Sequence, residues 1–251
     1  MDWHAGPAGV QERAEDAPET RIEISKVRVT RLLVGIAVVI HVLNIPAVAF
    51  KYAWPEHWSW ARHYVVLLSV SGEGKLPTFY SGLTMLAAAV LLGWIAVHER
   101  LRGHRFHAHW MWLGILFALM AMDEMVALHE MSARPLREFF GVSRGPLYHA
   151  WVIPAMAFLG FMAVAYFRFL FALPARTRIL FVVSGAIYVA GALGMEMIGS
   201  ARAAAYGQDL VYGVLATLEE VLEMSGMVLF LYSLMDHLER HAPESRIRVH
   251  R

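Results

Sequence analysis

The sequence predicts an all-α fold, namely a polytopic bundle of six transmembrane helices with both termini in the cytoplasm. Of its 251 residues, 58% are hydrophobic, whereas soluble domains contain about 45–50%. Charged residues make up 17%, less than the roughly 25% usual in soluble proteins. The apolar residues are gathered in long runs, and no ten-residue alternation typical of barrel strands is visible. A membrane-spanning helical bundle is therefore the fold class that we expect.

Six stretches have the roughly 20 apolar residues that a membrane-spanning helix needs. In chain order they are Arg31–Tyr52, Phe79–Val97, Trp110–Glu130, Ala150–Leu173, Ile179–Ser200 and Leu210–His237. We take residues 28–239 as the six-helix transmembrane domain. Residues 1–27 are polar and predict a disordered cytoplasmic tail, and residues 240–251 predict a second one.

The first two stretches are joined by a long segment rich in aromatic residues. Its rings are typical of the belt that lies at a membrane surface, and they belong to Trp54, Trp58, Trp60 and Tyr64. The apolar piece Tyr64–Val70 is expected to lie on or dip into that surface. Ser71–Gly74 predicts a turn, and Pro77 stands where a helix can begin.

The orientation follows from basic residues in the loops, which are enriched on the cytoplasmic side. On the side of the termini they are Arg21, Lys26, Arg28, Arg31, Arg100, Arg102, Arg105, Arg176, Arg178, Arg240, Arg246, Arg248 and Arg251. The opposite loops carry fewer, namely Arg62, Lys75, Arg134, Arg137, Arg144 and Arg202. Both termini are therefore predicted to be cytoplasmic.

Acids and histidines inside the apolar stretches are the strongest functional signal. A charged side chain near the centre of a spanning helix costs roughly 2.5–3.5 kcal/mol on insertion scales. These groups must therefore be paired, protonated or bound to a cation. With the predicted orientation they fall at one depth, in the outer half of the bundle, as do His41 and Asn44 of the first stretch. We call the following nine the predicted site residues: Asp123, Glu124, His129, Glu130, His149, Glu196, Glu219, Glu220 and Glu223.

Helical periodicity indicates which of these side chains share a face. At about 100° per residue, Glu219, Glu220 and Glu223 fall within one arc of about 100°. In a continuous helix Asp123 shares a stripe with Glu130, whereas His129 points away from Asp123. Small residues before Glu196 should let its helix approach its neighbours closely.

Three interpretations of these residues stay open. Carboxylates and imidazoles in a helical bundle can bind a metal pair, with iron or manganese favoured and magnesium or calcium also compatible. The usual Glu-x-x-His spacing is absent from the stretches, because Glu124 and His129 are five residues apart. Clustered acids can also relay protons or cations. Protonated acids can alternatively form a network that only ties helices together.

Other classes of function are excluded or disfavoured by composition. The chain has no cysteine, which excludes disulfides, thiolate metal sites and cysteine nucleophiles. Its net charge is +1, so no basic field indicates nucleic acid.

Several motifs together resemble a group of uncharacterised bacterial six-span integral membrane proteins. They are Leu76–Thr78 with Ser81, Met122–Glu124, His129–Glu130, Gly191–Glu196 and Leu218–Met224. The resemblance covers about Arg31 to Glu239. It implies the topology and a bacterial inner membrane, and it carries over no catalytic role.

The function that we expect from the sequence is a metal-dependent membrane enzyme whose site lies in the outer half of the bundle. Its partners would be the lipid bilayer and a lipid, quinone or other apolar substrate. A proton- or cation-coupled transporter is the first alternative. A structural or assembly subunit of a membrane complex is the second.

Overall fold

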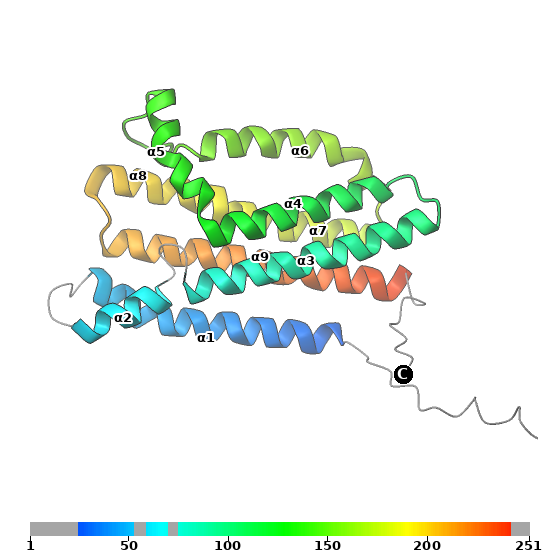
Figure 1. Ribbon diagram of the computed structural model, residues 1–251, viewed down its shortest axis with the longest axis horizontal. Helices are drawn as coiled ribbons and strands as arrows, with labels where there is room; N and C mark the ends of the chain where they lie inside the picture. The colour runs from blue at the N-terminus through cyan, green and yellow to red at the C-terminus, as the bar shows by residue number, and fades with distance from the viewer. Residues whose placement is uncertain (1–24, 53–58, 70–74, 242–251) are drawn as a thin grey trace, which may run out of the picture.

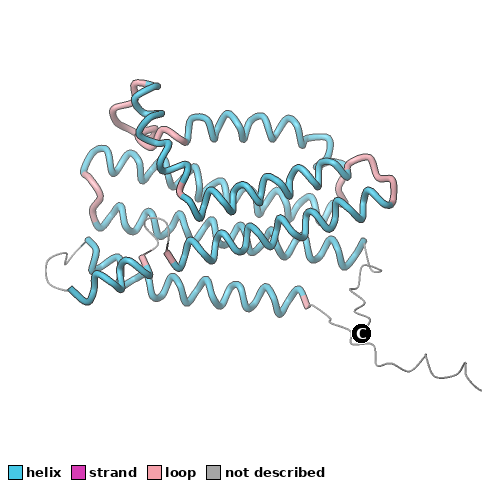
Figure 2. Tube along the Cα trace, viewed as in Figure 1, coloured by secondary structure: helices cyan, strands magenta, loops and turns pink. Residues whose placement is uncertain are grey.

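The computed structural model describes residues 25–52, 59–69 and 75–241, and it is a bundle of long helices (Figure 1). No strand occurs in this part of the chain, and short loops join the helices from α3 to α7 and from α8 to α9 (Figure 2). The helices are α1 Lys26–Tyr52, α2 Ser59–Leu68, α3 Leu76–Leu101, α4 His107–Val126, α5 Leu128–Phe140, α6 Val152–Ala172, α7 Ala175–Val189, the π-helical η1 Ala190–Met195, α8 Glu196–Tyr206 and α9 Leu210–His241. The prediction of an all-α fold is confirmed. The tails at residues 1–24 and 242–251, the turn Ser71–Gly74, and Trp54 and Trp58 lie outside the described residues.

Five helical segments are long and apolar enough to cross a membrane, which is compatible with a membrane protein. They are α1, α3, α4, α6 and the continuous segment Ala175–Tyr206 that contains α7, η1 and α8. The predicted sixth span, α9, has 32 residues but is not among the five. It carries Glu219, Glu220, Glu223 and Asp236, so its place in a membrane stays a prediction.

Helix α9 runs through the centre of the bundle, between α1 and α3 on one side and α7 and α8 on the other (Figure 1). The close approach of α7 depends on Gly226, because a Cβ atom there would lie 2.7 Å from the backbone nitrogen of Tyr188. Similarly, α4 approaches α3 at Gly114, where a Cβ atom would lie 3.2 Å from the carbonyl oxygen of Ala89. These glycines remove the side chains that would keep the helix axes apart.

One end of the bundle, which we call the basic end, gathers the start of α1, the α3–α4 turn, the α6–α7 turn and the end of α9 (Figure 1). Asp236 is 1% exposed there and accepts hydrogen bonds from Lys26, Arg176 and Arg240. In the same region Arg102 donates a hydrogen bond to the carbonyl oxygen of His241. Asp236 therefore ties α1, α7 and α9 together at the end where the sequence predicts cytoplasmic loops.

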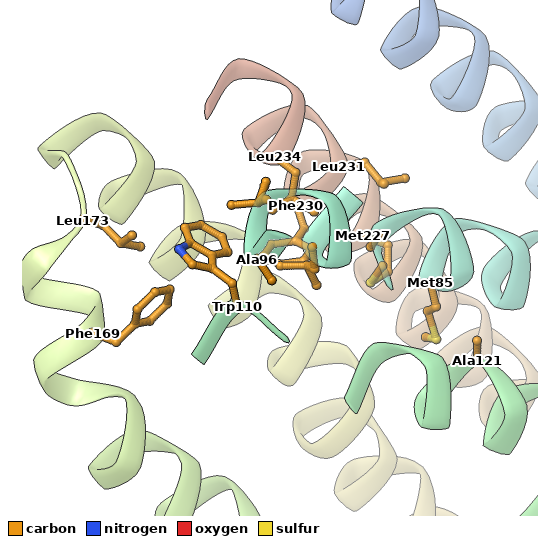
Figure 3. Packing of buried hydrophobic residues seen from close by; sticks show 13 residues of the cluster. Met85, Ala96, Trp110, Ala121, Phe169, Leu173, Met227, Phe230, Leu231 and Leu234 are labelled. Atoms are coloured by element: carbon orange, nitrogen blue, oxygen red, sulfur yellow. The ribbon is translucent and has the colours of Figure 1, made fainter. Parts of the chain in front are cut away.

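The largest apolar cluster of the described residues extends from Trp110 and Leu234 to Met85 and Ala121 (Figure 3). Trp110 is 2% exposed, and its ring packs edge-on against Phe169 of α6 and Phe181 of α7, at 5.0 and 5.7 Å between centroids. Burying aromatic rings of this size is a major source of stability. This contact attaches the end of α6 to the bundle.

Helix α6 is attached at its two ends and is little buried between them. Only Val152 in its first turn and Phe169 near its end are buried. It ends at Ala172, and the next residue, Leu173, has an extended backbone, as is usual for a residue before proline. The middle of α6 therefore lies apart from α4 and α7 (Figure 1).

Two predicted spans are not continuous α-helices. The stretch Trp110–Glu130 was predicted as one helix, and this is wrong, because α4 ends at Val126 and a new helix begins at Leu128. Ala127 between them has a φ of 62°, a left-handed conformation that breaks a helix. The stretch Ile179–Ser200 is continuous but contains the π-helical η1 directly before Glu196.

The short α2 corresponds to the piece expected at the membrane surface. It begins five residues earlier than predicted, at Ser59, and ends at Leu68. Tyr64 donates a hydrogen bond of 2.6 Å to the carbonyl oxygen of Leu43 in α1, so α2 is fixed against the end of α1.

Candidate functional site

A cavity of about 900 Å³ lies between α6 on one side and α4, α7 and α9 on the other. All nine predicted site residues line it, towards the end of the bundle opposite the basic end. They come from α4, α5, the segment before α6, α8 and α9. This arrangement agrees with the expectation that these residues, which are far apart in the sequence, meet in one place. The arrangement does not test whether they bind a metal ion.

Glu196 and His149 form the first acid–imidazole pair of the cavity. His149 Nδ1 lies 2.5 Å from Glu196 Oε1, and the two side chains are 21% and 12% exposed. The indole nitrogen of Trp151 donates to the same oxygen at 3.4 Å. The backbone nitrogen of His149 donates to Ser200 Oγ at 3.2 Å. These bonds hold the segment before α6 against α8.

Asp123 and His129 form the second pair. Asp123 Oδ1 accepts a hydrogen bond from the backbone nitrogen of His129 at 3.0 Å, and Oδ2 lies 2.8 Å from His129 Nδ1. The prediction that His129 points away from Asp123 was therefore wrong. It assumed an unbroken helix, whereas the left-handed Ala127 turns the chain so that Asp123 reaches the first turn of α5.

Trp151 links the two pairs. Its ring lies 4.7 Å from the ring of His129, measured between centroids, while its nitrogen bonds Glu196. Both histidines bond a carboxylate through Nδ1, which fixes the orientation of each ring. Two oriented imidazoles therefore lie beside one cavity.

The π-helical η1 brings Glu196 towards the acids of α9. A Cβ atom at Gly191 would lie 2.8 Å from the carbonyl oxygen of Glu219 and 2.9 Å from Cγ of Glu223. The carboxyl groups of Glu196 and Glu219 are in hydrogen-bonding contact. Two carboxyl groups in contact need a proton or a cation between them. Single-turn π-helical segments are often found at functional sites.

The remaining acids of the predicted site also line the cavity. Glu124 lies within electrostatic reach of Asp123, His129 and Glu130. Lys75, which precedes α3, interacts with Glu130 and Glu220. Burial lowers the pKa of Lys75 below its usual range, and Lys51 acts in the same direction, whereas Glu130 and Glu220 oppose the shift.

Within the described residues, no three or more acids and histidines form a group arranged to hold a metal ion. His149, Glu196 and Glu219 nevertheless form a chain of contacts. Imidazole and carboxylate contact each other directly in both pairs. This geometry is that of hydrogen-bonded pairs, and it leaves the predicted metal untested.

The rest of the cavity wall is apolar and aromatic. Phe117 and Phe230 stack at 4.7 Å between centroids, and Phe230 also contacts Phe181 at 4.9 Å. The opposite wall is a stripe of α6 with helical spacing, made of Pro154, Ala155, Phe158, Leu159, Met162, Ala163, Tyr166, Phe169 and Leu170. The cavity therefore has a polar half near Glu196 and an apolar half near the basic end.

His41 and Asn44 do not belong to this cavity. Asn44 is fully buried and donates a hydrogen bond to Thr217 Oγ1 at 2.9 Å. His41 bonds the carbonyl oxygen of Ala37 through Nδ1 at 2.8 Å. It lines a second, smaller cavity of about 560 Å³ between α1 and α9. The predicted topology placed His41 and Asn44 at the same depth as the nine site residues, but in the structure they are not close to them.

Several residues of the polar half were not singled out from the sequence, namely Trp151, Tyr188, Ser200, Gln208 and Tyr212. Tyr188 and Tyr212 line the cavity near the acids, and each interacts electrostatically with several of them. Tyrosine in an apolar helix is common, so only its position three and six residues before the glycines of η1 could have drawn attention to Tyr188.

These features define an all-α protein with a cavity that is acidic at one end and apolar at the other. The chain belongs to a family described as a domain of unknown function (DUF8692), whose pattern matches residues 31–238. No curated protein and no solved structure matches it.

Proposed function

We propose that this protein is a membrane enzyme that acts on an apolar or amphipathic molecule, of the lipid or quinone type, bound in the cavity beside α6. One observation carries the proposal, which is that a single cavity joins an aromatic half to two oriented imidazole–carboxylate pairs. Apolar pockets with a few converging polar groups are the usual form of a small-molecule site.

In this proposal α9 is the sixth span, the membrane is a bacterial inner membrane, and both termini are cytoplasmic. The gathering of Lys26, Arg102 and Arg176 at one end of the bundle supports this orientation. The polar half of the cavity then lies towards the outer surface, and its apolar half lies within the bilayer.

The proposed chemistry is proton exchange with the bound substrate. Glu196 holds Nδ1 of His149, so His149 takes or gives a proton through Nε2. Glu196 keeps the ring in that tautomer and stabilises its positive charge when it is protonated. Asp123 likewise orients the ring of His129. The carboxyl group of Glu219, in contact with Glu196, is a second group on the cavity wall that can exchange a proton with the substrate.

A metal-dependent enzyme is the second candidate, and the contact chain His149–Glu196–Glu219 favours it. Those three side chains would hold an ion such as iron or manganese, to which oxygen and imidazole ligands are suited. The bound ion would polarise a substrate oxygen. A proton- or cation-coupled carrier remains the alternative outside catalysis, because intramembrane acids also mark transport pathways.

The experiment is to identify what the cavity holds. Protein is purified in nanodiscs from its native membrane, and bound apolar molecules and metals are measured by mass spectrometry and elemental analysis. We expect one class of apolar molecule to be enriched. Ala163→Phe should reduce the amount of this molecule that is bound, because Ala163 lines the cavity, whereas Val164→Phe on the exposed face of α6 should not.

About one or two metal ions per chain, lost in Glu196→Gln, would favour the metal-dependent candidate. No enriched molecule, with both variants alike, would overturn the proposal.

A further inference from the structure

The charges around the polar half of the cavity are strongly unbalanced. Seven carboxyl groups line it, whereas the basic groups among its described lining residues are His129 and His149, with no lysine or arginine. Lys75 interacts with Glu130 and Glu220 from the segment before α3 but does not line the cavity. In a region of low dielectric constant such an excess of acids strongly disfavours an anionic group.

Aromatic rings stand among these acids. Trp151 lies against His129 and bonds Glu196. Tyr188 interacts with Glu223 and Glu124, and Tyr212 with Glu196 and Glu219. Both tyrosines line the cavity. A combination of aromatic faces and carboxylates is the environment that binds ammonium groups, through cation–π attraction and ion pairing.

The other half of the cavity contains no charged lining residue in the part of the chain that the structure describes, and its walls are the rings and aliphatic side chains of α4, α6, α7 and α9. It is therefore suited to an apolar chain or ring system. Its α6 wall belongs to a helix with large exposed apolar side chains on its other face too, including Phe161, Val164 and Phe167. A membrane molecule can approach such a helix from the bilayer.

We propose that the ligand of this cavity is a cationic amphiphile, with an amine or quaternary ammonium head among the acids and an apolar body beside α6. The inference rests on the proposed function, since it names the substrate class of the same site. The positive charge that the acids need is then carried by the substrate. Phosphate-headed lipids without a cationic group are rejected by the same acids.

The test compares three probes with one chain length and different heads, namely dodecyltrimethylammonium, dodecanol and dodecanoate. Their binding to the full chain is measured in phosphatidylcholine nanodiscs, and partition into empty nanodiscs is subtracted. We expect the ammonium probe to bind at least about tenfold more tightly than the alcohol, and the carboxylate to bind most weakly.

A matched pair of variants on α5 tests the role of the acids. Glu130 lines the cavity, whereas Glu138, two turns further on, is exposed and does not. Glu130→Gln should weaken binding of the ammonium probe several-fold and leave dodecanol unchanged, and Glu138→Gln should change neither. Glu220→Gln, a second cavity variant, should behave as Glu130→Gln does, so the test does not depend on one variant folding.

The outcomes separate this inference from the proposed function. If dodecanol binds as tightly as the ammonium probe and Ala163→Phe prevents both, the cavity is an amphiphile site but the cationic head is wrong. If dodecanoate binds most tightly, the inference is wrong as well. If no probe binds above the empty nanodiscs while the protein is folded, both the inference and the proposed function fail.

Discussion

Asp123 and His129 are joined twice, through the backbone nitrogen and through the ring of His129, although they lie on either side of a helix break. The carboxylate of Asp123 thereby accepts a hydrogen bond from a backbone N–H in the first turn of α5 and orients the imidazole beside the cavity. The contact depends on the left-handed backbone of Ala127 between the two helices. Local backbone strain of this kind is often found at functional sites.

Ala127→Gly should leave the protein as stable as the wild type or stabilise it by up to about 1 kcal/mol. The left-handed conformation costs a non-glycine residue roughly 1–2 kcal/mol, and the entropy of glycine offsets part of the gain. Thermal unfolding in detergent measures the effect. The control is Ala118→Gly inside α4, which should lower stability by about 1 kcal/mol. Equal losses in both variants would show that Ala127 is not strained.

Gly191→Ala should destabilise the protein by about 1–3 kcal/mol, as overpacking does in a dense interior. The added methyl group would press on the Glu219 carbonyl oxygen and on Glu223 Cγ and would move η1 away from α9. Gly194→Ala in the same π-helical segment should be tolerated, because no atom lies within 4 Å of its Cβ position. Thermal unfolding of the two variants side by side gives the comparison, and similar melting temperatures would contradict this account of η1.

The ion pair between Arg202 of α8 and Asp209, the residue before α9, predicts a pH dependence of stability. Hydrogen bonds from the Arg202 guanidinium, and then from the Tyr212 backbone, lower the pKa of Asp209 to about 2. The unfolded chain has a pKa of about 3.9 for aspartate. A lowered pKa in the folded state stabilises the protein above about pH 4, and this stabilisation is lost as the pH falls towards 2.

Asp209→Asn removes this charge while keeping an oxygen that can accept the hydrogen bond from the Tyr212 nitrogen. The wild type should therefore melt at a higher temperature than the variant at pH 7, and the difference should shrink between pH 4 and pH 2. A difference that stays constant over that range would show that the ion pair does not stabilise the fold.

Asp236→Asn should lower the stability by about 1.5–3 kcal/mol, because it removes the buried carboxylate that accepts hydrogen bonds from Lys26, Arg176 and Arg240. Glu239 also bonds Lys26 but is 63% exposed. Glu239→Gln should therefore cost less than about 1 kcal/mol. Chemical denaturation of both variants measures the two losses, and a small loss for Asp236→Asn would argue against the network as the tie between α1, α7 and α9.

The proposed orientation predicts the location of reporter fusions. Fusions at Arg102 and Arg176 should report the cytoplasm, and a fusion at Gly141, the residue after α5, should report the outer side. The reverse pattern would place the polar half of the cavity on the cytoplasmic side, and the same location for all three would refute the six-span topology.

The sequence predicted the helical class and most of the helices, because long apolar runs have few alternatives in a membrane. From the sequence we also predicted that the acids of α4, α8 and α9 lie together, since burying each of them alone is costly. It missed the contact between Asp123 and His129 because periodicity assumes an unbroken helix, and nothing in Ala127 marks it as left-handed. The π-helical turn at η1 was equally hidden, since it differs from an α-helix only in its hydrogen-bond register.

The cavity itself could not be predicted from the sequence. The apolar pattern of α6 is the same whether its inner face packs on other helices or faces a cavity. The contacts of His149 and Trp151 before the helix, and of Phe169 near its end, attach α6 at its two ends. Its middle is not packed against α4, since no residue between Val152 and Phe169 is buried.

The measurement that tests the central claim most directly is conversion of a membrane molecule by the purified protein. A lipid extract of the native membrane is incubated with the wild type, with Glu196→Gln and with the exposed-site control Glu138→Gln, and the products are compared by mass spectrometry. The account predicts that one substrate declines and a product appears with the wild type and the control, at least about 100-fold faster than with Glu196→Gln, as expected when His149 loses the carboxylate that orients it for general acid–base catalysis. Identical extracts after incubation with all three folded proteins, together with proton-dependent flux across vesicles containing the wild type, would contradict it and would show that the acids serve transport.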